Sequence, residues 1–434
     1  MWTPSFHNSL FFTTIYAIIR GSEEVIIILL NQVIKLRLTN VAPPVTTALI
    51  QVQTQYMQAC QFVSDYVFNH DFELNSNKLS HVLYHDIRQR FALKAQLASS
   101  VFKTVTARYK TVQSQLRQKP YRVNDGEKWL SIPKDLPWLW QPVQFKRPQA
   151  DLVRNRDYSF VADKQQLSLQ TLGKRIKTTF TASGFKQYLD GTWKLGTAKL
   201  LRADHKWYLH IAVSKTVPDV DAQTQSTNVI GIDRGLRFLA TTYDTQGKTR
   251  FFSGRQILRK HAYYQKRRAA LQAIGTKSSK HKLKRLSGKE NRWLSDVNHQ
   301  LSKTLITRYG VNSLFVIEDL TNVTFDTDNL PKSLRNSNRS WAFYQLEHYL
   351  TYKAHANQSN VLKVSAAYTS QRCPKCGLIR KSNRNHNSHE YRCQNCGYRS
   401  NDDRLGAMNI QQLGTQFVSG TVKPKFVFNT NLDA

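Results

Sequence analysis

Four cysteines that fall within 24 residues constrain the fold of this chain more than any other feature of its sequence. They form two Cys-x2-Cys pairs, each followed by glycine, with sixteen residues between the pairs: Cys373, Cys376, Cys393 and Cys396. Each pair turns tightly enough to aim two sulfurs at one ion, and the spacing is typical of a ribbon that binds one Zn²⁺ through four thiolates. Since four protein ligands leave no open coordination position, we predict a structural zinc site. A redox-active pair is the alternative, which two matched pairs with trailing glycines disfavour.

The other cysteine and the histidines near the pairs have simpler interpretations. Cys60 lies in an apolar helical pattern, which predicts a buried side chain. His386 and His389 lie between the two pairs, and we interpret both as loop residues because the four thiolates already complete a coordination shell. An odd cysteine count with tight pairing is atypical of a secreted disulfide framework, which indicates a reducing, intracellular compartment such as the cytoplasm.

The charge of the chain indicates a polyanionic partner. Its 434 residues include 63 Lys and Arg against 29 Asp and Glu, a net charge of +34. Such an excess is unusual for a metabolic enzyme and favours nucleic acid over membrane lipid or mere solubility. The excess is uneven, because residues 255–308 hold fifteen basic side chains and two acidic ones, interleaved with Tyr263, Tyr264 and Trp293. This pattern predicts a basic helical region that neutralises phosphates.

The first 32 residues differ from the rest of the chain. Their apolar runs, 10–19 and 25–30, are both shorter than the roughly 20 residues that span a bilayer, and the order of a signal peptide is missing. We interpret 1–32 as an extension of uncertain status, either poorly ordered or translated from too early a start; a weak membrane anchor is the alternative. Residues 33–39 then alternate apolar and polar side chains, which predicts the first strand of the folded protein.

Hydrophobic periodicity divides the remainder into helical and strand regions. Residues 45–70 and 84–118 repeat as amphipathic helices, whereas about 130–217 repeats with a period of two, which is typical of a small antiparallel barrel or sandwich. Within it, 193–216 predicts two strands joined by a turn at 203–205. Further along the chain we expect a hairpin at 228–254, strands at 313–320 and 361–370, and a helix at 341–356.

Three acidic residues lie at predicted junctions between elements. Asp233 and Glu318 each end an apolar strand, and Asp403 begins a helical segment. An acid beside a hydrophobic strand is costly to bury unless it binds a cation. Three carboxylates brought together can hold two Mg²⁺ ions about 4 Å apart, which activate a water and stabilise the leaving oxygen of a phosphodiester. Taken singly, each acid fits an ordinary loop or cap residue better than a catalytic one.

Five motifs occur in one order along the chain. They are GIDRGL (231–236), VIEDL (316–320), YTSQRCPKCG (368–377), YRCQNCG (391–397) and DRLGAMNI (403–410). With these motifs the chain, over residues 33–413, resembles the TnpB family, the RNA-guided endonucleases of bacterial insertion sequences that are often labelled transposases and are related to type V CRISPR effectors. The C-terminal half carries nearly all the specificity of this resemblance, and the N-terminal half matches by layout only.

The resemblance assigns the family's three catalytic acids to Asp233, Glu318 and Asp403, which would bind the two Mg²⁺ ions. Asp319 is the rival for the second position, and strand alternation puts it on the face opposite Glu318. For the third position the chain departs from the family pattern, with Leu405 in place of an Asn and Gly406 in place of an Ala, and Asp402 is a rival acid. The offset of six residues before Asn409 favours Asp403.

The resemblance implies an α+β multidomain fold in which an RNase H-like RuvC nuclease domain carries an inserted zinc ribbon. The expected parts are the extension 1–32, a β-barrel wedge domain (33–39 and 130–224), a helical recognition domain (40–129), the RuvC domain (225–365 and 400–413, with 255–308 as a basic helical insertion), the ribbon (366–399) and a flexible tail (414–434).

The same resemblance implies the partners. A guide RNA from the transposon end would supply sequence specificity by base pairing with a double-stranded DNA target, and the protein would recognise a short target-adjacent motif. A co-encoded transposase would be functionally linked, the protein would be nucleoid-associated, and no membrane partner is expected. Two alternatives stay open: a nuclease-inactive RNA-guided repressor, which the presence of all three acids disfavours, and a transposase that itself performs strand transfer.

Overall fold

The computed structural model forms two compact units. One comprises Asn31–Lys215, here the N-terminal unit, and the other comprises Thr13–Leu30 and Thr216–Ala434, here the C-terminal unit. The boundary falls within strands β2 (Glu23–Thr39) and β10 (Lys206–Pro218). The structure describes residues 13–20, 23–161, 165–182, 184–320, 343–385 and 388–428. Within these ranges, no helix is both long and apolar enough to cross a membrane.

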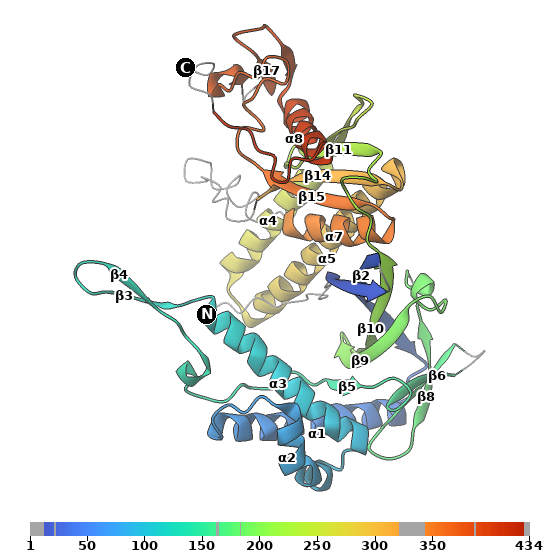
Figure 1. Ribbon diagram of the computed structural model, residues 1–434. Coiled ribbons are helices and arrows are strands. Elements are labelled where there is room, and N and C mark those ends of the chain that lie inside the picture. Colours follow the sequence, from blue (N-terminus) through green and yellow to red (C-terminus); the bar gives the residue numbers. More distant parts are fainter. Residues whose placement is uncertain are drawn as a thin grey trace. The chain divides into compact units, whose positions relative to one another are not determined.

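Three helices form one part of the N-terminal unit (Figure 1): α1 (Pro43–Asn69), α2 (Ser76–Phe91) and α3 (Ala95–Arg117). The period over 84–118 predicted one helix, but Ala92 adopts a left-handed conformation (φ 50°) and separates α2 from α3. The hydroxyl of Tyr56 on α1 bonds to Ser100 and Thr104 on α3, at 3.0 and 2.8 Å. Cys60 is 1% exposed, as its apolar pattern predicted.

An antiparallel sheet forms the other part of the N-terminal unit. Its path is β5-β9-β10-β2-β8-β7-β6. Strand β1, which belongs to the C-terminal unit, pairs with residues 23–30 of β2 off this path. The turn between β9 and β10 lies at Asp204 and His205, both with positive φ, where the sequence predicted it. The prediction that the first strand begins at residue 33 was wrong, because β2 begins at Glu23; a run apolar on both faces hides strand alternation. The remaining bounds are β1 (Thr13–Arg20), β5 (Ala150–Leu152), β6 (Tyr158–Val161), β7 (Gln166–Leu169), β8 (Ile176–Thr181) and β9 (Lys194–Ala203), with the 3-10 turn η2 (Lys186–Tyr188).

A five-stranded sheet in the order β13-β12-β11-β14-β15 forms the centre of the C-terminal unit. Strands β11, β14 and β15 run parallel, and β12 and β13 run antiparallel to their neighbours. The predicted hairpin over 228–254 is therefore three strands. The bounds are β11 (Asn228–Asp233), β12 (Phe238–Tyr243), β13 (Thr249–Ser253), β14 (Ser313–Asp319) and β15 (Asn360–Ser365).

Helices cover both faces of this sheet (Figure 1). Ile230 and Ile317 pack in a core with residues of α5 and α7, whereas Val229 and Val316 pack in a second core with residues of α8. Side chains that alternate along one strand thus enter different cores, which explains why these strands are apolar throughout. The helices are α4 (Arg255–Ile274), α5 (Lys277–Tyr309), α7 (Phe343–Ala356) and α8 (Asp402–Val418). Helix α8 continues beyond residue 413, where the sequence predicted a flexible tail.

Two small sheets complete the described structure. Strands β16 (Arg384–Asn385), β17 (Glu390–Arg392) and β18 (Arg399–Asn401) form one, beside the 3-10 turn η3 (Lys381–Asn383). Strands β3 (Tyr121–Asn124) and β4 (Trp129–Ile132) form a separate hairpin, followed by the 3-10 turn η1 (Leu136–Trp138).

Candidate active site and metal centres

Two of the predicted acids lie side by side at the carboxyl ends of parallel strands. Asp233 is the last residue of β11, and Glu318 is the residue before the last of β14. The register pairs Ile232 with Ile317, so the two acids follow in neighbouring positions. The carboxyl ends of parallel strands are where open α/β sheets place their ligands.

Helix α8 brings the third acid to the same place. Asp403 lies in its first turn, and the side chain of Asn401 caps the helix by accepting from the Arg404 N–H. One turn later, Gly406 faces Asp233 so closely that a Cβ there would lie 3.0 Å from Asp233 Oδ2. At Gly231 a Cβ would lie 2.1 Å from a carbonyl oxygen of α8, so the helix rests directly on the β11 backbone.

Burial raises the pKa of all three carboxylates, and the other two acids raise that of Asp233 further. Burial, and then the charges of Glu318 and Asp403, raise the pKa of Asp233 well above its ordinary value. Burial raises the pKa of Glu318 despite a 2.5 Å hydrogen bond from the Thr369 hydroxyl, and burial together with Asp402 raises that of Asp403. The structure therefore places Glu318 and Asp403 near enough to Asp233 to raise its pKa, and a bound cation would relieve this repulsion.

One oxygen of this cluster lacks a protein donor. Asp403 Oδ2 is buried, and no hydrogen-bond partner reaches it from the described residues. A buried carboxylate oxygen without a donor is costly unless an ion or water satisfies it. The donor set consists of hard carboxylate oxygens, which are the ligands that Mg²⁺ prefers. The residues present therefore fit a divalent cation.

The rival acid Asp402 has a different environment. Its side chain is fully buried and accepts from Arg384 Nε and Nη2, both at 3.0 Å, while His389 Nδ1 lies 3.4 Å away. The ligand atoms of His389, Asp402 and Asp403 lie within 4.8 Å of one another, close enough to share a metal ion. Asp402 is thus paired with Arg384, whereas Asp403 keeps an oxygen without a protein donor.

Two basic residues near the acids were missed by sequence reasoning. The charge of Arg384 lowers the pKa of Asp233, Glu318 and Asp403, and the interpretation of His389 as a plain loop residue overlooked its contact with Asp402. Neither residue stands out in so basic a sequence. Both lie between the cysteine pairs, and only the folded structure shows that this segment contacts the start of α8. His386 lies outside the described residues.

Arg234 fixes the backbone of Glu318 through a hydrogen bond. Its side chain is 2% exposed, and Nη2 donates to the Glu318 carbonyl oxygen at 2.6 Å while Nη1 lies 3.4 Å from Glu347 Oε2. On α8, the Asn409 side chain also donates to backbone carbonyl oxygens, those of Thr369 and Arg372, at 2.7 and 2.8 Å. The Asn409 bonds connect helix α8 to the segment that leads into the first cysteine pair, and the Thr369–Glu318 bond connects the end of β14 to the same segment.

The four paired cysteines form a second cluster. Cys373 Sγ lies 3.6 Å from Cys396 Sγ, Cys376 Sγ lies 3.5 Å from Cys393 Sγ, and all four sulfurs lie within 4.8 Å of one another. Tetrahedral Zn–S bonds of about 2.3 Å place sulfurs about 3.8 Å apart, so the cluster fits one zinc ion.

The backbone around each pair explains the trailing glycines. Gly377 and Gly397 have φ of 83° and 72°, and their N–H groups donate to the carbonyl oxygens of Cys373 and Cys393, both at 3.0 Å. Burial raises the pKa of Cys373 to about 12. Burial also acts to raise the pKa of Cys376, but a backbone hydrogen bond from Leu378 and the neighbouring thiols lower it to about 7.

The cysteine cluster packs against the start of α8. Leu405 is fully buried in one core with Cys373, Cys393 and Tyr391. Both departures from the family pattern thus have a physical reason here: Leu405 packs against the cysteine module, and Gly406 leaves room for the Asp233 carboxylate.

Comparison with known protein families gives matches over two regions of the chain. Residues 343–410 match the family described as "Cas12f1-like, TNB domain", and residues 210–323 match the OrfB_IS605 family, described as "Probable transposase". The chain is 24% identical over 382 residues to the CRISPR-associated endodeoxyribonuclease Cas12f1 of Sulfoacidibacillus thermotolerans, which covers 80% of this chain and 86% of that protein. It is 30% identical over 161 residues to the TnpB-like protein MJ0751 of Methanocaldococcus jannaschii, covering 36% of this chain and 56% of that protein.

The chain is a TnpB-type relative of the type V CRISPR effectors. A solved Cas12f1 structure, determined with its sgRNA and target DNA, shares the fold of this TnpB-type chain with a TM-score of 0.55 and 15% identity, covering 84% of this chain and 82% of the other. The family resemblance and the mixed α/β fold expected from the motifs are therefore confirmed.

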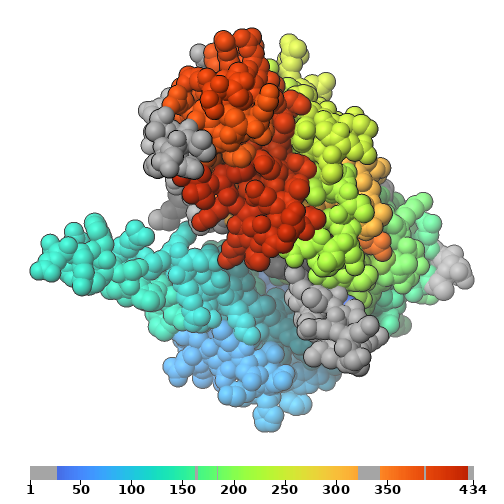
Figure 2. Space-filling view, turned by 45° about the horizontal axis from the view of Figure 1, so that its top comes forward, coloured from blue at the N-terminus to red at the C-terminus, as the bar shows by residue number. Residues whose placement is uncertain are grey.

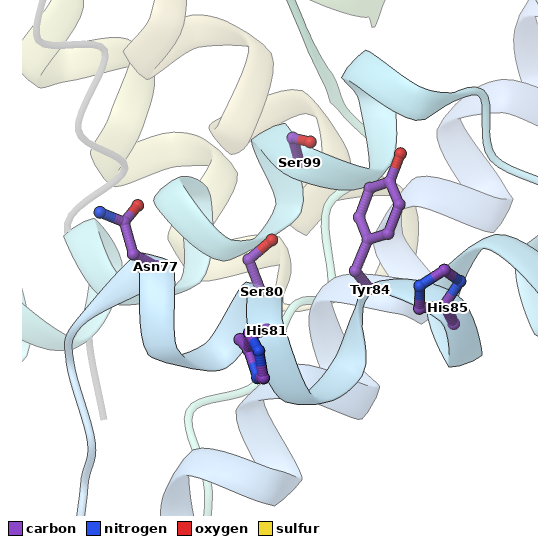
Figure 3. Close-up of a pocket in the computed structure, with 6 residues that line it drawn as sticks. All are labelled: Asn77, Ser80, His81, Tyr84, His85 and Ser99. Atoms are coloured by element: carbon purple, nitrogen blue, oxygen red, sulfur yellow. The ribbon is translucent and has the colours of Figure 1, made fainter.

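A polar hollow on the N-terminal unit of the TnpB-type chain does not belong to the acidic cluster. Its lining side chains project from α2 and α3 (Figure 3). No carboxylate or thiol is among them, so this hollow offers none of the ligands found at the two clusters. The lining residues are Asn77, Ser80, His81, Tyr84, His85 and Ser99.

Proposed function

We propose that this chain is an RNA-guided, Mg²⁺-dependent DNA endonuclease encoded by an insertion sequence. It would cut DNA next to a short target-adjacent motif and so support maintenance of the transposon. The observation that carries the proposal is the meeting of Asp233, Glu318 and Asp403, from two strands and a helix far apart in sequence, around a buried oxygen without a protein donor. The names of the matched relatives, a DNA endonuclease and a TnpB-like protein, support the same function.

In this proposal the three carboxylates hold two Mg²⁺ ions in a RuvC-type, RNase H-like site. When bound, such a pair of ions activates the attacking water and stabilises the leaving oxygen of the phosphodiester. Thr369 and Arg234 orient Glu318 through its side chain and its carbonyl oxygen respectively. Arg384 supplies positive charge next to the acids and keeps Asp402 paired, which leaves Asp403 available to a metal ion.

The four thiolates would hold one structural Zn²⁺, and the ribbon would fix the first turn of α8 through Leu405. We further propose the domain organisation expected from the sequence: a wedge domain, a helical recognition domain and a split RuvC domain. The guide RNA would come from the transposon end, and the target would be double-stranded DNA. The net charge of +34 supports a protein that holds several nucleic-acid strands together.

The experiment that tests the function begins with purification of the protein from cells that also express its flanking DNA, followed by sequencing of the bound RNA. We expect a defined transcript from the transposon end, and Mg²⁺-dependent cleavage of a duplex that matches its guide. Asp233→Ala should abolish cleavage and spare binding of the matched duplex.

Three results would contradict this proposal. Cleavage by Asp233→Ala at the wild-type rate would show that the site is wrong. Guide-dependent binding with no cleavage by the wild-type protein would identify a repressor, and strand transfer on transposon ends without RNA would identify a transposase.

A further inference from the structure

The β3–β4 hairpin and the turn that follows it, residues 121–140, expose an unusual set of side chains; we call this segment the aromatic hairpin. Figures 1 and 2 show it extending away from the helices of its own unit. Its large apolar side chains with their exposed fractions are Tyr121 (47%), Trp129 (70%), Leu130 (41%), Ile132 (42%), Trp138 (47%) and Trp140 (83%). Three of the eight tryptophans of the chain therefore lie exposed within twelve residues.

The register places an apolar surface on one face of the aromatic hairpin. Tyr121 pairs with Ile132 and Val123 pairs with Leu130, so these four side chains share that face. Trp129 pairs with Asn124 and lies on the opposite face, so exposed rings are present on both sides of the ribbon. The Trp138 ring extends it, with its centroid 5.8 Å from that of Tyr121. A two-stranded ribbon is marginally stable alone in water, and an apolar face of this kind marks an interaction site.

The base of the aromatic hairpin is fixed to α3. Asp135 accepts from Gln113 at 2.7 Å and from Arg117 at 2.6 Å, and its own side chain caps the turn at Leu136. At the tip, Asp125 accepts from the backbone N–H groups of the turn. These carboxylates hold the hairpin in shape, so the aromatic face is presented on a stable support.

The cations of the aromatic hairpin indicate the chemistry of its partner. Lys134 Nζ lies 5.8 Å from the Tyr121 ring centroid and 5.7 Å from that of Trp138. Arg122 and Lys128 are exposed on the ribbon, and the acid Glu127, next to Lys128 in the turn, is exposed as well. Aromatic rings interleaved with cations are the combination that stacks on unpaired bases and neutralises the adjoining phosphates. A second copy of the chain is a poor partner, because each copy carries a net charge of +34.

We propose that the aromatic hairpin binds unpaired nucleotides of the guide RNA, with bases stacked on its exposed rings and phosphates paired with Arg122, Lys128 and Lys134. This inference rests on the proposed RNA-guided function. RNA fits better than target DNA because an exposed apolar face needs a partner that stays bound. Proteins recognise folded RNA chiefly through its unpaired, splayed bases.

The test compares Trp129→Ala/Trp140→Ala with wild-type protein, Trp129→Phe/Trp140→Phe and the control Val82→Ala, which removes an exposed apolar side chain from α2 of the same unit. The readouts are the Kd for the co-purified guide RNA, the melting temperature, and the sites of ultraviolet crosslinks between RNA and protein. We expect the double alanine variant to bind RNA roughly 10- to 100-fold more weakly. Its melting temperature should not change, the phenylalanine variant should retain most of the affinity, and crosslinks should map to 121–140.

An unchanged Kd with crosslinks elsewhere would overturn the proposal. So would a loss confined to target-DNA binding, or a self-association of the wild-type protein that the double variant abolishes. If the wild-type protein bound no RNA at all, the proposed function itself would fail, which is a different outcome from failure of the hairpin alone.

Discussion

The acidic cluster and the cysteine cluster differ in how far apart their residues lie in the sequence and in whether the site is closed. The four cysteines come from one local segment, and their sulfurs already stand at distances that suit one ion. The three acids come from β11, β14 and α8, spread over 171 residues from Asp233 to Asp403, and the other two raise the pKa of Asp233. The cysteine cluster is a closed site, whereas the acidic cluster keeps a carboxylate oxygen without a protein donor.

Because of this difference, the two clusters contribute to the stability of the fold in different ways. A closed four-thiolate site contributes to stability when it binds its metal, since the ligands gain little from one another without it. An open acidic site costs stability when empty and is retained for the chemistry that it permits. Changes in the two clusters should therefore act on different measurable quantities.

The largest expected effect comes from Glu318→Gln compared with its neighbour Asp319→Asn. Glu318 faces the other acids, whereas Asp319 lies 3.7 Å from Lys363 Nζ at the half-exposed end of β14. We expect Glu318→Gln to reduce the rate of guide-directed DNA cleavage by roughly 10³-fold or more, and Asp319→Asn to change it by less than about threefold. Single-turnover cleavage with saturating Mg²⁺ is the measurement. Equal effects of the two substitutions would show that strand alternation has misidentified the acid.

The second prediction concerns the cysteine cluster. Metal analysis should find about one zinc per chain in the wild-type protein, and Cys373→Ser should lose it. We expect the free energy of unfolding of the ribbon to fall by on the order of 3 kcal/mol or more. Thermal unfolding and elemental analysis are the measurements, with Cys60→Ala as a control that removes a buried thiol but keeps the zinc. A folded wild-type protein without metal would disprove the zinc assignment.

The third prediction tests the contact between α8 and β11. Gly231→Ala places a Cβ 2.1 Å from the Ala407 carbonyl oxygen, which must move α8 away from the sheet. We expect a loss of about 3 kcal/mol in the free energy of unfolding of the C-terminal unit. Gly173→Ala, where a Cβ meets nothing within 4 Å, should change stability by less than about 0.5 kcal/mol. Denaturant unfolding compares the two variants, and wild-type stability in Gly231→Ala would mean that the helix does not rest on the strand.

The smallest expected effect separates stability from activity. Gly406→Ala improves the helix by about 1 kcal/mol, but its Cβ would lie 3.0 Å from Asp233 Oδ2. We expect the melting temperature to hold or rise while the cleavage rate falls by roughly tenfold, because the carboxylate must shift. The measurements are the melting temperature and the cleavage rate of the variant, taken on the same preparation. A rate that did not change would show that the Asp233 carboxylate can move freely without loss of function.

Much of this arrangement could be predicted from the sequence because its signals are local. The Cys-x2-Cys spacing, the apolar runs that end in Asp233 and Glu318, and the turn at 203–205 each depend on neighbouring residues. The order of the motifs indicated the resemblance to the TnpB family, and the comparisons then confirmed it. The assignment of the three acids to catalysis stays a prediction, although the structure brings them together.

What the sequence could not predict depends on contacts between distant residues. Nothing near Arg384 signals that it pairs with Asp402, and nothing near Leu405 signals a core shared with Tyr391. The break at Ala92 was also hidden, because a left-handed residue inside an amphipathic period leaves the apolar pattern intact. The early start of β2 was obscured for the opposite reason, since its first residues lack alternation.

The close approach of α8 to β11 has a consequence for how such proteins diverge. Gly231 and Gly406 set the spacing between strand and helix through backbone atoms and a carboxylate, with no large side chain between them. Substitutions elsewhere in the core can then accumulate without altering the separation of Asp233 from the start of α8. A chain that keeps glycine at position 231 can therefore change much of its sequence and still hold helix α8 against β11.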